Sequence, residues 1–103
     1  MIFRRRFADT IARQLDLFAV EEAGLIADCE AAERAYDRAD RDDAIERYAA
    51  YDDLLDSAAQ ALAEIRDGFA LSLGEETAEQ YAKAFDRAAA KRFGKLALGL
   101  PEI

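Results

Sequence analysis

The sequence predicts an all-α protein, an antiparallel three-helix bundle built on a long helical hairpin with a shorter third helix. The first observation is composition: Ala, Glu, Lys, Leu and Arg supply 59 of the 103 residues, against nine β-branched residues and a single Pro. The second is periodicity, because apolar residues recur at spacings of three and four over long stretches. A chain of this length buries one core, so we expect residues 1–103 to form a single helical domain.

The first helix is expected from about residue 5 to about residue 39. Its stripe has the spacing of a coiled-coil seam and comprises Ile11, Leu15, Phe18, Glu22, Leu25, Cys29, Ala32 and Tyr36. The stripe runs through Gly24, and a glycine inside a helix costs only about 1 kcal/mol relative to alanine. We therefore expect one unbroken helix. The alternative ends a first short helix at Gly24 and begins a second one after it.

The second helix is expected to begin at Asp40, whose carboxylate can cap the free amides of the first turn. Its stripe has the same spacing and comprises Ala44, Tyr48, Tyr51, Leu55, Ala58, Leu62, Ile65 and Phe69. Gly68 or Gly74 can end it. The predicted hairpin of two long helices is roughly 45–50 Å long.

The third helix is expected to be shorter and to begin at the capping-box spacing of Ser72 and Glu75. Its stripe comprises Ala78, Tyr81, Ala82, Phe85, Ala88, Ala89 and Phe93. It closes with basic residues around Gly94, where cations suit the carbonyl end of a helix.

Charge is distributed unevenly along the chain. Residues 1–13 carry +3, residues 14–79 carry −14 and residues 80–103 carry +3, for a net charge of −8. Short connections make consecutive helices antiparallel neighbours. An up-down-up path then places the basic N-terminus beside the acidic start of the third helix. The same path brings Lys91, Arg92 and Lys95 towards the turn at residues 40–43.

The residue types present exclude most kinds of catalytic and zinc-binding site. There is no His and one Cys, so His-based acid–base catalysis, Ser-His and Cys-His nucleophiles and ordinary zinc sites are ruled out. We expect no enzyme, no catalytic residue and no cofactor. The acidic balance disfavours nucleic acid, although residues 1–6 form a basic arm. We expect no membrane span and no signal peptide, and the lone Cys29 fits a reducing cytoplasm.

Apolar residues outside the main stripes predict a partner-binding surface. Leu17 and Val20 lie on a different face of the first helix from Leu15, and the apolar tail of residues 96–103 adds Leu96, Leu98 and Leu100. Exposed together, these five leucine and valine residues would form a patch of the kind that marks an interface. The sequence therefore predicts a non-enzymatic module that self-associates as a homo-oligomer or binds a protein partner. It leaves open whether the tail docks on its own chain or on another.

The alternative function depends on Glu22, a carboxylate at a stripe position. Inward carboxylates of helical bundles can hold metal ions, but without His the usual di-iron site cannot form. A hard cation or a cationic ligand bound near Glu22 stays open, with Asp52, Asp53 and Asp56 of the second helix as further carboxylates.

Overall fold

The protein is all-helical, as predicted. The computed structural model describes residues 2–101, with side chains from residue 7 onward. This part of the chain forms four α-helices and one short 3₁₀ helix: α1 (Ile2–Glu21), α2 (Ala23–Asp37), α3 (Ala44–Ala70), α4 (Glu75–Phe93) and η1 (Gly94–Ala97). The molecule measures 51 × 23 × 22 Å.

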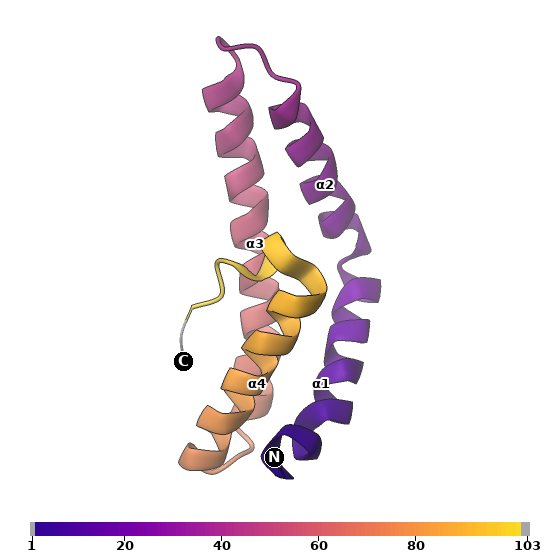
Figure 1. The fold of residues 1–103 in the computed structure, drawn as a ribbon, viewed down its shortest axis with the longest axis vertical. Coiled ribbons are helices and arrows are strands. Elements are labelled where there is room, and N and C mark those ends of the chain that lie inside the picture. Colours follow the sequence, from indigo (N-terminus) through magenta and orange to yellow (C-terminus); the bar gives the residue numbers. More distant parts are fainter. Residues whose placement is uncertain (1, 102–103) are drawn as a thin grey trace.

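The chain runs up, down and up again along its long axis (Figure 1). Helices α1 and α2 follow one another in one direction, α3 returns beside them, and α4 runs back beside α1. With 19 residues, α4 is about 29 Å long and stops roughly halfway along the molecule. The three-helix topology is not confirmed, because the described chain has four helices. Beyond the end of α4, α2 and the first half of α3 form a two-helix hairpin.

The chain bends at Glu22, where the expected single helix is divided. Its backbone has φ −106° and ψ 24°, so α1 ends at Glu21 and α2 begins at Ala23. Helical hydrogen bonds still cross the bend, from the Glu22 amide to the Phe18 carbonyl and from the Ile26 amide to the Glu22 carbonyl, both at 2.9 Å. The prediction of one continuous helix was wrong, and so was a break at Gly24, which lies inside α2. The bend lets α1 pack mainly on α4 while α2 packs on α3.

The core lies in the half of the molecule that contains α1 and α4. The residues buried there include Phe7 and the predicted stripe residues Ile11, Leu15, Phe18, Leu62, Tyr81 and Phe85. At the far end of the hairpin, Tyr36 and Tyr48 lie on the same predicted stripes yet are 37% and 52% exposed. They stay exposed because no third helix reaches them.

The predicted caps are wrong in detail. Helix α3 begins at Ala44 after Asp43, which makes no side-chain capping bond, while the Asp40 carbonyl accepts from the Asp43 amide at 3.0 Å. Ser72 does not cap α4. Its hydroxyl donates to the Phe69 carbonyl at 2.7 Å and so closes the end of α3.

The C-terminal tail docks on its own chain. Gly94 has φ +55°, a conformation that other residues rarely adopt, and it turns the chain from α4 into η1. Ala97 is buried, and Leu96 and Leu100 pack against the core. At Gly99 the tail passes so close to α3 that an added Cβ would lie 3.2 Å from the Ala59 Cβ.

Candidate functional site

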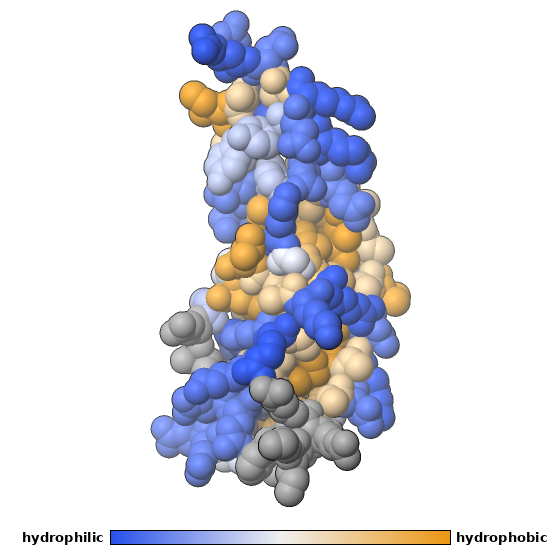
Figure 2. Space-filling model, viewed as in Figure 1, coloured by the Kyte–Doolittle hydropathy of each residue, from blue (hydrophilic) through white to orange (hydrophobic). Residues whose placement is uncertain are grey.

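A groove of about 730 Å³ runs between α1 and α4. The residues that line it are Ala8, Ile11, Ala12, Leu15, Ala84, Arg87, Ala88, Lys91 and Arg92. Ile11 and Leu15 are buried core residues that form the apolar floor. The alanines on both helices leave the space above the floor unfilled. Figure 2 shows apolar side chains between the hydrophilic side chains of the two helices, in the lower half of the view.

Within residues 7–101, the charged residues that line this groove are all basic. Arg92 of α4 donates from Nη1 to Asp16 Oδ1 of α1 at 2.6 Å, and this ion pair bridges the two helices. Arg87 and Lys91 are exposed and form no ion pair within residues 7–101. The groove therefore combines an apolar floor with positive charge that is not neutralised inside the described chain.

The opposite end of the molecule is acidic and partly apolar. Residues 28–56, which cover most of α2, the turn and the first half of α3, contain eleven acids and four bases, a net charge of −7. Ile45 is 84% exposed there, and the rings of Tyr36 and Tyr48 meet edge to face at 5.3 Å. We call this part the hairpin end. It holds nearly all of the chain's net negative charge.

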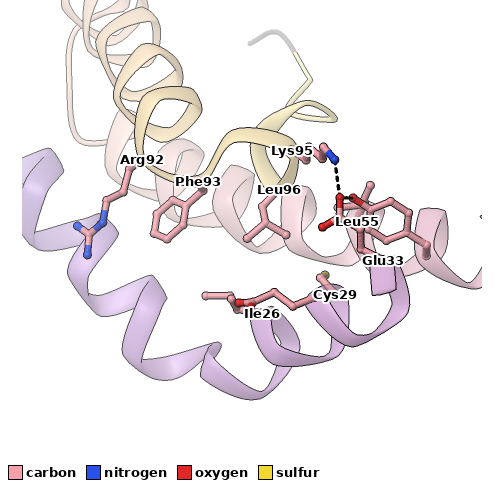
Figure 3. Close-up of a pocket in the computed structure, with 10 residues that line it drawn as sticks. Ile26, Cys29, Glu33, Leu55, Arg92, Phe93, Lys95 and Leu96 are labelled. Atoms are coloured by element: carbon pink, nitrogen blue, oxygen red, sulfur yellow. Dashed lines mark hydrogen bonds and ion pairs between the residues drawn. The ribbon is translucent and has the colours of Figure 1, made fainter. Parts of the chain in front are cut away.

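A second cavity of about 320 Å³ lies between α2, α3 and η1 (Figure 3). Its apolar lining comprises Ile26, Leu55, Phe93 and Leu96. Lys95 of η1 donates to Glu33 Oε2 of α2, and the Tyr51 hydroxyl of α3 donates to the same oxygen at 3.2 Å. The hydrogen bond from Lys95 lowers the pKa of Glu33 and raises the pKa of Lys95. Through Glu33, these hydrogen bonds link η1 to α2 and to α3.

Cys29 also lines this cavity and is 2% exposed. Burial raises the pKa of its thiol, and the nearby carboxylates of Asp28 and Glu30 raise it further. The thiol is therefore protonated at neutral pH, which is the opposite of what a nucleophilic cysteine requires.

The basic residues near the end of α4 find partners other than the predicted ones. Lys95 and Arg92 were expected near the turn at residues 40–43, but they pair with Glu33 and Asp16 instead. That expectation was wrong, because α4 ends well short of the turn.

Two buried polar side chains make hydrogen bonds between helices. Arg66 was missed in the sequence, whereas Tyr81 lies on the predicted stripe of the third helix. Arg66 of α3 is 1% exposed and donates to Asp67 Oδ1 at 2.9 Å and to Asp86 Oδ1 of α4 at 2.8 Å. Tyr81, fully buried, donates to Gln14 Oε1 of α1 at 2.7 Å. Arg66 lies four residues from both Leu62 and Ala70, a spacing that could have placed it on a buried face.

The five predicted partner-binding residues differ in exposure. Leu17 and Val20 on α1 are 52% and 75% exposed, and Leu98 is 79% exposed. Leu96 and Leu100 are partly buried against the core of their own chain. After η1 the chain crosses α3 towards the side away from α1 (Figure 1). The side chains of the basic arm, residues 1–6, lie outside the described part.

The surroundings of Glu22 offer no visible metal site. Glu22 is half-buried at the bend, and residues 7–101 bring no group of three or more Asp, Glu, Cys or His side chains together as ligands. None of the described helices combines the length and apolar character needed to cross a membrane.

No protein-family model, no curated protein and no solved structure matches this chain. Its function is therefore inferred from its own surfaces, of which the α1–α4 groove and the hairpin end are the most distinctive.

Proposed function

We propose that the protein is a non-enzymatic interaction module of the cytoplasm that binds an acidic amphipathic helix in its α1–α4 groove. In this proposal α1 and α2 together act as one bent arm of a three-helix bundle, and the groove lies between that arm and α4. The observation that carries the proposal is the combination of an apolar floor with a rim whose described charged residues are Arg87, Lys91 and Arg92.

Physical chemistry supports this kind of ligand. An amphipathic helix lays an apolar stripe into a groove of this type and makes contact at positions i, i+3, i+4 and i+7. Alanines at Ala8, Ala12, Ala84 and Ala88 leave room for its larger side chains. Acidic residues beside that stripe would meet Arg87 and Lys91, and charge complementarity of this kind selects among partners.

No observation favours the carboxylate site near Glu22 as a second function, since the described residues hold no convergent ligand set around it.

The test is binding of a fluorescent helical peptide of about 20 residues, with leucines along one stripe and glutamates flanking it. We expect saturable binding in fluorescence anisotropy. Ala88→Trp, which fills the groove, should weaken it at least about tenfold, or 1.4 kcal/mol.

Ala90→Trp is the matched control, because Ala90 is exposed on the same helix and does not line the groove. It should bind the peptide as the wild type does. Absence of saturable binding, or equal weakening by both tryptophans, contradicts the proposed function.

A further inference from the structure

We infer that the groove is filled by the hairpin end of a second copy of this chain, in an antiparallel two-fold dimer. This inference rests on the proposed function and names the partner for that same groove.

The two surfaces are complementary in charge. All three charged residues lining the groove are basic, and Arg87 and Lys91 have no ion-pair partner within residues 7–101. The hairpin end carries a net charge of −7 of the chain's −8. One chain thus supplies both the basic groove and the acidic hairpin end. Electrostatic complementarity of this kind fixes the register of two chains and selects the partner.

They are also complementary in apolar character. Ile45, 84% exposed, and Tyr48, 52% exposed, lie one turn or less apart on α3 within the acidic end. In a monomer this two-helix hairpin has no third element to cover these side chains. In the groove, Ile11 and Leu15 are 3% and 2% exposed and form the floor beneath the alanines that line it.

The geometry allows a closed dimer. The molecule is 51 Å long, and Figure 1 shows α4, which forms one side of the groove, in one half of it and the turn of the α2–α3 hairpin at the other end. Placing two chains antiparallel brings each hairpin end over the other chain's groove, and one two-fold axis satisfies both contacts. A standard interface needs about 800 Å² from each chain, roughly a ninth of the 7125 Å² accessible surface.

A charge-swap experiment tests this arrangement. Variant X carries Arg87→Glu and Lys91→Glu in the groove, and variant Y carries Asp42→Lys and Asp43→Lys in the hairpin end. All four positions are exposed, and circular dichroism checks that both variants remain helical. Masses are measured by sedimentation equilibrium for wild type, X, Y and an equimolar mixture of X and Y, up to about 100 µM.

We expect wild type to be a dimer that weakens as salt is raised. X and Y alone should each dissociate at least about tenfold more readily. X places acidic residues in the groove that faces the acidic hairpin end. Y lowers the net charge of the hairpin end from −7 to −3 and places two lysines in it. The mixture should form an X·Y dimer, because the substituted positions of the X groove and the Y hairpin end carry opposite charges, and the second contact joins unchanged surfaces. Lys83→Glu is the control for added negative charge on α4, because Lys83 is exposed and does not line the groove. It should leave the dimer intact.

Three results would overturn the inference: a wild type that stays monomeric, a mixture of X and Y that does not associate, or a Y variant that dimerises as well as wild type. The last result indicates a contact that does not use the hairpin end. A monomer that still binds the acidic peptide refutes only the second copy as occupant. A chain that neither dimerises nor binds the peptide refutes the proposed function as well.

Discussion

Tyr81 gives the sharpest test of how the core is held together. Its ring is fully buried and contacts the rings of Phe7, Phe69 and Phe85, with centroids 5.4, 4.8 and 6.0 Å away. Its hydroxyl donates to Gln14 across the α1–α4 interface. Tyr81→Phe removes this hydroxyl and leaves the ring in place.

At pH 7 the substitution should cost about 1 kcal/mol of unfolding free energy, the usual net value of one such hydrogen bond. Gln14 is only half-buried, so water can reach its freed oxygen and hold the cost near that value. For a domain of this size, 1 kcal/mol corresponds to a fall in Tm of about 4–8 °C.

At alkaline pH Tyr81→Phe should become more stable than the wild type. Burial raises the pKa of Tyr81 from 10 to about 12, so the folded protein holds this proton more tightly than the unfolded chain does. This difference in pKa contributes to the unfolding free energy. The contribution is complete below pH 10 and is lost as pH rises through 12. The full difference in pKa corresponds to about 3 kcal/mol. About 2 kcal/mol of this is lost by pH 12 in the wild type and none in Tyr81→Phe. The two stability curves should therefore cross near pH 11.

The assay is urea unfolding followed by circular dichroism between pH 7 and pH 12. Tyr48→Phe, at an exposed tyrosine, is the control and should follow the wild-type profile. Parallel profiles for wild type and Tyr81→Phe across this range would refute the argument that burial opposes ionisation of Tyr81.

Other substitutions test further features, each by urea unfolding at pH 7. Gly94→Ala should destabilise by about 1–2 kcal/mol because of its positive φ, whereas Gly68→Ala, in α3 with open space around it, should stabilise by about 0.4–1 kcal/mol. Opposite signs are the expected result, and equal signs would contradict this reading of Gly94. Arg66→Ala should cost about 3 kcal/mol or more, because it leaves a hole beside two carboxylates; a neutral result would mean that Arg66 is not buried as described. Lys95→Met should cost less than about 1 kcal/mol and lose its effect in high salt, since its contact with Glu33 is exposed; a larger, salt-independent cost would show that the network does more than hold η1.

Much of each helix could be predicted from periodicity alone. Ile11, Leu15 and Phe18 in α1, and Tyr81 and Phe85 in α4, are buried as their spacing indicates. The third predicted stripe matches α4 closely because α4 packs on both α1 and α3.

The helix boundaries and the candidate site could not be predicted to the same extent. Ser72 and Asp40 have good capping chemistry, but tertiary packing begins the helices at Glu75 and Ala44 instead. The predicted patch included Leu96 and Leu100, which tertiary packing partly buries against the core of their own chain. The groove was missed because its walls are alanines, which look like ordinary helix formers in a sequence.

The sequence by itself determined that this protein is helical, which residues of each helix are apolar, and that its middle is acidic. Only the tertiary structure decided that the chain bends at Glu22 and that α4 covers one half of the molecule. The reason is that local spacing specifies an apolar face for each helix, whereas the partner of that face depends on packing between segments distant in the chain. The groove and the uncovered hairpin end both result from that packing.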